Sequence, residues 1–245
     1  MLFKNIFNKA SSGVYVTRLT ISENYDDINI PSERHIYNLI NSNHWFVSRK
    51  ERLRPRYIKR FSTRRKYFVK TNNKFVFPMI CRPYCVNARL RSTDYEIDLI
   101  CGSSKIKKSG YLVVLINRLS RKYYIMKCRS KNGFIVTATV KKIIEKYKLV
   151  ITTLTCDQGS EFEKLGLVAK WLNFKVYYCD SYKSYQKGSI ENCNSIARRF
   201  FPNPTNFMDL SDEYIEEKMN EINNMPRKLL GDLSANQYEE KFFKK

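Results

Sequence analysis

The spacing of apolar and polar residues in the second half of the chain predicts three consecutive strands. Residues 94–101 are predicted to form one strand, residues 111–116 form an apolar second strand directly after Gly110, and residues 122–128 form a third. The connections between these runs are short, which is typical of an antiparallel meander. We therefore expect three neighbouring strands at the start of one sheet.

Helical and extended patterns then alternate. Val140, Ile143 and Ile144 recur with the period of a helix, and the residues that follow are apolar and β-branched. The predicted elements are a helix over 134–148, a strand over 149–156, a helix over 160–172, a strand over 174–179 and a helix over 188–200. The order β-β-β-α-β-α-β-α is that of ribonuclease H-like folds, so we expect an α/β core with a five-stranded mixed sheet and flanking helices.

The chain before this core is harder to interpret. Pro31-Ser32-Glu33 is typical of a helix start with Ser32 as N-cap, whereas residues 1–30 show no obvious first helix for a complete helix-turn-helix. We expect a small, basic, partly helical N-terminal region. The predicted organisation is an N-terminal segment (1–30), a basic DNA-binding remnant with linker (31–92), a catalytic core (93–203) and C-terminal helices on that core (204–245).

Net charge narrows the class of partner. The 245 residues include 45 Lys and Arg but only 23 Asp and Glu, which gives a formal charge of +22. Such a surplus indicates a polyanionic partner, either nucleic acid or an acidic membrane surface. Nucleic acid is favoured because no basic amphipathic helix, which would suit a membrane surface, stands out. The chain has no apolar window long enough for a membrane span and no signal-peptide pattern at its start, so we expect a cytoplasmic protein without membrane contact.

About half of the surplus lies in one stretch. Residues 49–70 hold 11 basic residues and one acid, with aromatic residues interleaved. This pattern is typical of DNA binding, although a solvated linker would also carry such charge. The predicted DNA-binding residues of this stretch are Arg52, Arg54, Arg56, Lys59, Arg60, Arg64, Arg65 and Lys66.

Three carboxylates stand at positions that favour a shared site. Asp98 interrupts an apolar strand, where a lone buried carboxylate is costly without a cation. Asp157 follows the strand at 149–156, at the edge where open α/β sheets bind ligands. Glu191 lies near the start of the helix at 188–200.

Such a cluster of acids repels itself and is stabilised by hard divalent cations. We expect two Mg²⁺ or Mn²⁺ ions bound by Asp98, Asp157 and Glu191, which would serve phosphoryl transfer on nucleic acid. Each acid also has a structural interpretation: Asp98 could pair with a buried Arg, Asp157 could cap the following helix, and Glu191 could be an exposed helical residue.

The helix at 188–200 carries further candidates on the same face as Glu191. Asn194 and Arg198 follow it by three and seven positions, so helical geometry places all three on one side. We expect Asn194, Arg198 and Lys187, which directly precedes the helix, to contact DNA. A surface charge or an ion pair with Glu191 is the alternative for Arg198.

The motifs around these acids resemble a known family. Residues 153–162 (TLTCDQGSEF), residues 186–194 (QKGSIENCN) and the later runs RRFFP at 198–202, TNF at 205–207 and NMPRKLLG at 224–231 are similar to DDE transposases of bacterial insertion sequences, in particular the IS-thirty family. The resemblance covers about residues 93–245. It implies a retroviral-integrase-like core in which Asp98, Asp157 and Glu191 are the catalytic, metal-binding triad.

The resemblance also implies an activity and partners. Transposases of this kind recognise terminal inverted repeats, cleave the ends of the element and join 3′-hydroxyls to target DNA, acting as multimers. We therefore expect DNA integration by a homo-oligomer at the bacterial nucleoid. Two alternatives stay open: a truncated, decayed transposase that only binds DNA, and a nuclease acting on RNA–DNA hybrids.

Other candidate residues favour structural roles. His35 and His44 precede Cys81 and Cys85 in the order of a zinc module, but the spacing departs from the usual one. The seven cysteines are expected to be reduced and mostly buried. Glu96 and Glu161 are expected to cap helices or support the ligands rather than bind metal.

Overall fold

The computed structural model describes residues 2–9, 13–42, 44–45, 47, 73–180 and 184–243. Within these ranges the side chains of residues 8, 9, 41, 184, 185, 188, 189, 191 and 192 are not described.

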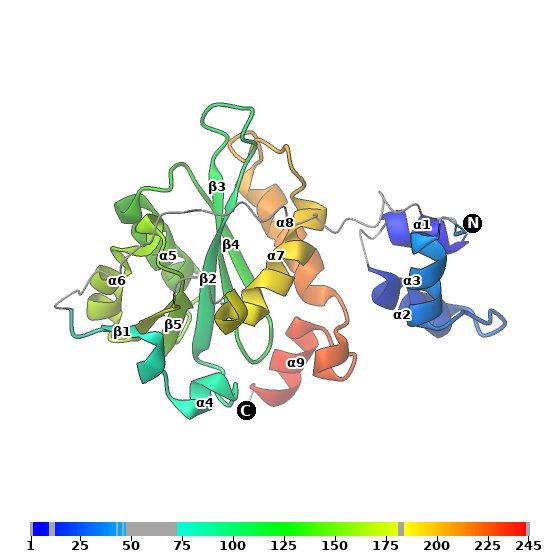
Figure 1. Ribbon diagram of the computed structural model, residues 1–245, viewed down its shortest axis with the longest axis horizontal. Helices are drawn as coiled ribbons and strands as arrows, with labels where there is room; N and C mark the ends of the chain where they lie inside the picture. Colours follow the sequence, from blue (N-terminus) through cyan, green and yellow to red (C-terminus); the bar gives the residue numbers. More distant parts are fainter. Residues whose placement is uncertain are drawn as a thin grey trace.

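A mixed sheet of six strands forms the centre of the described structure (Figure 1). Its spatial order is β1-β6-β5-β2-β3-β4. The strands are β1 (Val76–Pro78), β2 (Asp94–Cys101), β3 (Tyr111–Asn117), β4 (Tyr123–Cys128), β5 (Thr153–Cys156) and β6 (Lys175–Tyr178). The helices after β1 are α4 (Tyr84–Asn87), α5 (Gly133–Lys146), α6 (Leu165–Leu172), α7 (Gly188–Phe200), α8 (Asp212–Asn224) and α9 (Ala235–Phe242).

The pairing of the strands agrees with the predicted fold class. Strands β2, β3 and β4 form the antiparallel meander, while β5 pairs in parallel with β2 and β6 in parallel with β5. The α/β core with a mixed sheet is thereby confirmed. A sixth strand is added because Val76 pairs with Val176 at the sheet edge, within the segment that we assigned to the basic linker.

Two apolar cores cover the two faces of the sheet. On one face Val113 and Leu115 of β3 pack with residues of α5 and α6. On the other face Leu112, Val114 and Ile116 pack with residues of α7 and α8. This alternation follows the period of two along a strand, and it explains why β3 has no polar face: it is buried on both sides.

The predicted strand at 149–156 begins later in the structure, at Thr153. Helix α5 ends in a Schellman motif, in which the Leu149 N–H donates to Ile144 O at 2.9 Å and Lys148 adopts a φ of 50°. This turn directs the chain away from the sheet, so the apolar residues after it stay unpaired. Val150 is accordingly 71% exposed.

The predicted helix at 160–172 is divided. A short 3₁₀ turn over Ser160–Phe162 precedes α6, which ends where Asn173 takes a left-handed φ of 54°. None of the helices in the described ranges has both the length and the apolar composition that a membrane crossing requires.

The N-terminal region contains more helix than expected. Helices α1 (Leu2–Lys9), α2 (Val14–Asn24) and α3 (Glu33–Asn41) share a small apolar core of their own. Ser32 caps α3 as predicted, since its hydroxyl accepts from His35 N at 3.3 Å. The expectation that residues 1–30 lack a first helix is wrong. The polar residues of α2 interrupt its apolar pattern and concealed it.

The N-terminal helices contact the C-terminal part of the chain. The Tyr15 hydroxyl donates to Asp232, and the Lys228 ammonium lies 5.9 Å from the centre of the Tyr15 ring. The segment after α8 therefore connects the N-terminal helices to the core.

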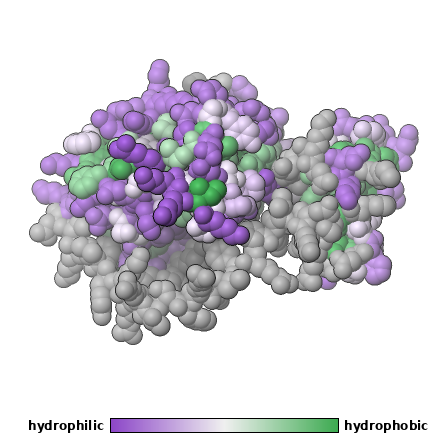
Figure 2. Space-filling view, turned by 90° about the horizontal axis from the view of Figure 1, so that it is seen from above, coloured by the Kyte–Doolittle hydropathy of each residue, from purple (hydrophilic) through white to green (hydrophobic). Residues whose placement is uncertain are grey.

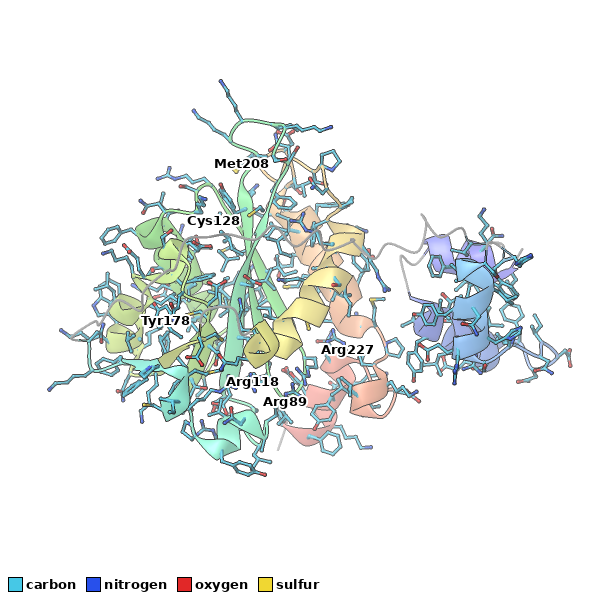
Figure 3. All side chains as sticks on the ribbon, in the orientation of Figure 1. Arg89, Arg118, Cys128, Tyr178, Met208 and Arg227 are labelled. Atoms are coloured by element: carbon cyan, nitrogen blue, oxygen red, sulfur yellow. The ribbon has the colours of Figure 1, made fainter. Side chains whose placement is uncertain are left out.

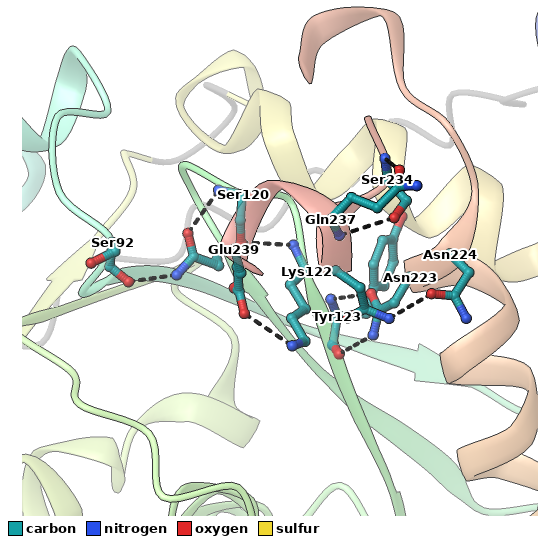
Figure 4. A network of polar contacts seen from close by, with 11 residues as sticks. Ser92, Ser120, Lys122, Tyr123, Asn223, Asn224, Ser234, Gln237 and Glu239 are labelled. Atoms are coloured by element: carbon teal, nitrogen blue, oxygen red, sulfur yellow. Dashed lines mark hydrogen bonds and ion pairs between the residues drawn. The ribbon is translucent and has the colours of Figure 1, made fainter. Parts of the chain in front are cut away.

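One buried asparagine completes the outer edge of the sheet. At the start of β4, Asn223 of α8 accepts from Tyr123 N at 2.8 Å and donates to Tyr123 O at 2.9 Å (Figure 4). The Asn223 amide thus replaces a neighbouring strand, and only 1% of this residue is exposed. Because the two backbone groups would otherwise be buried without partners, this contact joins α8 to the sheet.

We predict that Asn223→Ala lowers the free energy of unfolding by about 2–4 kcal/mol, because it leaves a buried N–H and a buried C=O unpaired. Urea denaturation would measure the loss. Asn224→Ala is the matched control, since Asn224 is exposed and, in the described part of the chain, its side chain is hydrogen-bonded to Asn236 alone. Equal losses in the two variants would contradict the assigned role of Asn223.

Candidate acidic site at the carboxyl ends of the strands

Asp98 lies in β2 on the side that faces α7. Its backbone pairs with Val114 of β3, and its Oδ2 atom accepts from Asn194 Nδ2 of α7 at 2.7 Å. Its Oδ1 atom accepts from Leu99 N at 2.9 Å. Burial raises the pKa of Asp98 and the nearby Asp157 adds to this, whereas Lys187 and the two hydrogen bonds oppose it.

Asp157 directly follows β5, which is the parallel neighbour of β2. Parallel strands end at the same edge of a sheet, so the fold brings Asp157 towards Asp98. The Asp157 Oδ1 atom accepts from Gly159 N at 2.9 Å, which closes a turn of the backbone. Its side chain is 45% exposed.

One ammonium group lies between these two carboxylates. Lys187 Nζ is 3.6 Å from Asp98 Oδ1 and 3.4 Å from Asp157 Oδ2, and the side chain is only 8% exposed. Burial alone would lower the pKa of Lys187, but the two carboxylates outweigh it and raise the pKa above its ordinary value. Among the described residues the two acids therefore share a single cation, Lys187, which leaves the pair with a net negative charge.

Helix α7 supplies two more polar groups beside this site. Asn194 donates to Asp98, while its Oδ1 atom is buried and has no partner among the described residues. Arg198 Nη2 donates to Cys101 O at 2.6 Å, and Arg198 Nη1 is likewise buried without a partner in the described part of the chain. Both residues lie on the face of α7 that contacts β2.

The third predicted acid is placed only by its backbone. Glu191 belongs to α7 and precedes Asn194 by three positions, but its side chain lies outside what the structure describes. The same holds for the predicted DNA-binding residues of the basic stretch, all of which fall within 48–72. The structure thus brings Asp98, Asp157, Lys187 and Asn194 together and leaves the position of the Glu191 carboxylate as a prediction.

Glu96 has a structural role that sequence reasoning named only in general terms. One of its carboxylate oxygens accepts from the buried guanidinium of Arg118, and Oε2 accepts from Ile190 N at 2.9 Å. Ile190 N is one of the free N–H groups at the start of α7, so Glu96 caps that helix from a neighbouring strand. In Figure 3, Arg118 lies where the start of α7 meets the lower part of β2.

The signal for this role was present in the sequence. Glu96 and Asp98 are two positions apart in one strand, so both must face α7. What the pattern did not show was the partner, since Arg118 comes from the turn between β3 and β4. Burial lowers the pKa of Arg118 while Glu96 opposes that shift.

The zinc alternative finds no support in the described residues. They contain no group of three or more His, Cys, Asp and Glu side chains that could hold a metal. His35 and His44 are exposed in the N-terminal helical region, and Cys81 is exposed in the short turn that follows β1. The expectation of mostly buried thiols is confirmed, because Cys128, Cys156, Cys179 and Cys193 are buried.

We predict that Glu96→Ala destabilises the fold by about 3–5 kcal/mol, because it leaves the Arg118 charge buried and unpaired. Urea denaturation would measure this effect. Glu145→Ala is the control, since Glu145 is 57% exposed in its pair with Lys141 and should contribute less than about 0.5 kcal/mol. A loss at Glu96 no larger than at Glu145 would refute the capping role.

Comparison with known proteins agrees with this geometry. The integrase core domain family matches residues 93–184, which include β2 to β6 with Asp98 and Asp157. The transposase for insertion sequence element IS4351 of Bacteroides fragilis is 33% identical over 64% of the chain and 47% of its own length. The probable transposase for element IS1161 of Streptococcus salivarius is 29% identical over 85% of the chain and 58% of its own length.

A further relative comes from an element of the IS-thirty family, which the sequence motifs resemble. Transposase InsI for insertion sequence element IS30C of Escherichia coli K12 is 29% identical over 56% of the chain and 35% of its own length. The chain thus spans about half the length, or less, of these relatives. Residues 93–184 match an integrase core domain, and the resemblance of the chain to insertion-sequence transposases is confirmed.

Proposed function

We propose that the chain acts as a DDE transposase, a polynucleotidyl transferase that cleaves DNA strands and joins them to target DNA. The observation that carries this proposal is the pair formed by Asp98 and Asp157, which meet at the carboxyl edge of the sheet and share one ammonium group. The similarity to transposases supports the choice of DNA as substrate.

The residues of this site fit a divalent metal. The ammonium of Lys187 marks a position between two carboxylates where a cation is stabilised, and carboxylate oxygens are ligands that Mg²⁺ and Mn²⁺ prefer. Asp98, Asp157 and Glu191 would hold two such ions. When bound, the ions would activate a water or a 3′-hydroxyl and stabilise the leaving oxygen of a phosphodiester.

The protein's own residues would then position the reactants. Asn194 would hold the Asp98 carboxylate in place through its 2.7 Å hydrogen bond, and its Oδ1 atom, which is buried without a partner among the described residues, would accept from a bound water. Displacement of Lys187 from the carboxylates would free its ammonium for a DNA phosphate. Arg198 on the same helix would supply a second donor to a phosphate oxygen once its guanidinium, which is bonded to Cys101 O and has its Nη1 atom buried, turns towards the DNA.

DNA binding beyond this site would rest on the basic stretch at 49–70, whose phosphate contacts require no particular base sequence. We propose that the DNA partners are the terminal inverted repeats and the target, that copies of the chain assemble on paired ends, and that they act in the cytoplasm at the nucleoid.

Two other functions would leave different signatures. A decayed transposase would bind DNA with strong salt dependence yet show no metal-stimulated cleavage of terminal-repeat DNA. A nuclease of the same fold would cut RNA–DNA hybrids without joining ends. The transposase is favoured because the named relatives are transposases.

We predict that Asp157→Asn abolishes Mg²⁺- or Mn²⁺-dependent strand transfer while DNA binding stays within about twofold, because the change removes one ligand charge and no phosphate contact. Oligonucleotides that carry the terminal repeats of the element provide the substrate. Asp27→Asn is the control, since it makes the same chemical change in an exposed N-terminal turn. Strand transfer that survives Asp157→Asn would exclude the proposed triad.

We further predict that Lys187→Met raises the affinity for Mn²⁺ by about fivefold or more, since removing a positive charge about 4 Å from the carboxylates favours a cation by at least about 1 kcal/mol. Isothermal titration calorimetry would measure the affinity. The melting temperature in a chelator should fall, because the two acids lose their shared cation. Lys187→Arg is the control, because it keeps the positive charge and should keep the Mn²⁺ affinity low. If Lys187→Met bound Mn²⁺ no more tightly than the parent protein, the metal and the Lys187 ammonium would not occupy overlapping positions.

A further inference from the structure

One long segment of the core contains no acidic residue. Asp98 is followed by 46 residues, 99–144, that hold 11 Lys and Arg and neither Asp nor Glu. This segment carries β3, β4 and the connections between them. Its charge is therefore distinct from the basic stretch at 49–70.

The exposed part of this charge begins at the turn between β2 and β3. Residues 104–108 are all exposed, and Lys105, Lys107 and Lys108 lie among them. No carboxylate of the described residues forms an ion pair with these three lysines. We call residues 104–108 the hairpin tip.

The base of the hairpin tip is firmly held. Gly102 N donates to Gly110 O at 3.0 Å, and the Ser109 hydroxyl donates to Ser103 O at 2.7 Å. Ser103, Ser109 and Gly110 are buried, in contrast to the tip between them. Charge on a fixed support loses less entropy on binding than charge on a freely moving loop.

A second loop braces the hairpin from the side. Ser103 N donates to Thr205 O at 3.0 Å, and Phe207 N donates to Ser109 O at 2.8 Å. Met208 lies against Gly110, whose φ of 73° and lack of a side chain permit this close approach (Figure 3). The tip thus projects from the sheet on two supports.

The hairpin tip and the acidic site lie at the same edge of the sheet. Strands β2, β4, β5 and β6 run in one direction, so their carboxyl ends share this edge with Asp157. The hairpin projects at the top of Figure 1, and Figure 2 looks down on it and shows a largely hydrophilic face over the core.

The loop after β4 adds charge at this edge. Arg129 and Lys131 are exposed and, like the tip lysines, have no ion pair with a described carboxylate. Strand β4 runs in the same direction as β2, so this loop lies at the edge of the sheet where the hairpin tip and Asp157 lie. The hairpin tip and this loop together form a surface that we call the basic rim.

We propose that the basic rim binds the phosphate backbone of duplex DNA and guides it past the acidic site. The proposal rests on the proposed function, because it names a surface for the DNA on which that site acts. Lysine and arginine side chains at an exposed edge suit phosphates, and no ion pair with a described carboxylate neutralises those of the rim. Contacts of this kind carry no base specificity, so the rim would serve any duplex.

The test compares two triple variants of the full chain by fluorescence anisotropy with a random-sequence duplex. The first is Lys105→Gln with Lys107→Gln and Lys108→Gln. The salt slope is the slope of a plot of the logarithm of affinity against the logarithm of salt concentration. It should become less steep by about one for each lysine that contacts a phosphate, which amounts to about two to three in this variant. Glutamine removes the charge and keeps an unbranched, polar side chain.

The matched control is Lys74→Gln with Lys170→Gln and Lys175→Gln. These three lysines are also exposed, but Lys74 and Lys175 lie at the starts of β1 and β6, at the opposite edge. The control removes the same charge and should leave the salt slope within about 0.5 of the parent value. A slope in the hairpin variant that equals that of the control would overturn the proposal.

This readout separates the rim from the catalytic proposal. DNA binding is measured without metal, so a protein that fails in strand transfer can still show the difference between the two variants. Strand transfer that depends on Asp157 together with equal salt slopes would overturn the rim and leave the catalytic site intact.

Discussion

The rest of the site depends on one constraint: two carboxylates, the fully buried Glu96 and the partly buried Asp98, lie on the side of β2 that faces α7. Alternate residues of this strand point to that helix, and two of them are Glu96 and Asp98. A buried carboxylate needs a cation or hydrogen-bond donors. Glu96 obtains Arg118 and the Ile190 N–H, while Asp98 obtains Lys187 and the Asn194 amide. Each acid therefore binds a group within or directly before α7, and together they fix how that helix lies on the sheet.

The negative charges of the two acids are neutralised to different extents. For this reason Glu96 has a structural role, whereas Asp98 can bind a ligand. Glu96 is completely buried, has a cation of its own and satisfies a free N–H of a helix, so it has no capacity left for a ligand. Asp98 shares its cation with Asp157, because β2 and β5 are parallel neighbours. A pair of carboxylates with one positive charge between them retains net negative charge, and further positive charge is stabilised there. The fold thus leaves one carboxylate pair incompletely neutralised.

The sequence predicts those parts of this arrangement that depend on neighbouring residues. It does not predict the parts that depend on residues far apart in the chain. Strands such as β3 were evident because long apolar runs depend only on local pattern. The start of β5 was misplaced because a Schellman motif at Lys148, rather than hydrophobicity, decides where pairing resumes. Strand β1 and the capping of α7 by Glu96 depend on partners far along the chain, such as Val176 and Arg118, which periodicity cannot identify. Helix α2 escaped notice because tertiary packing, not an apolar stripe, holds it.

Charge is distributed in the core in a way that composition alone does not reveal. The sheet exposes acids and bases at one edge, yet keeps them on different elements: Asp157 follows β5, whereas the basic rim follows β2 and β4. If these charges were interleaved, they would pair with one another, and neither phosphate nor divalent cation would find an unsatisfied partner. The acid-free segment after Asp98 prevents such pairing, because no carboxylate stands next to the rim in the chain. At this edge Lys187 does pair with acids, since its ammonium neutralises part of the charge of Asp98 and Asp157. Lys187 stands at the start of α7, however, and does not belong to the basic rim.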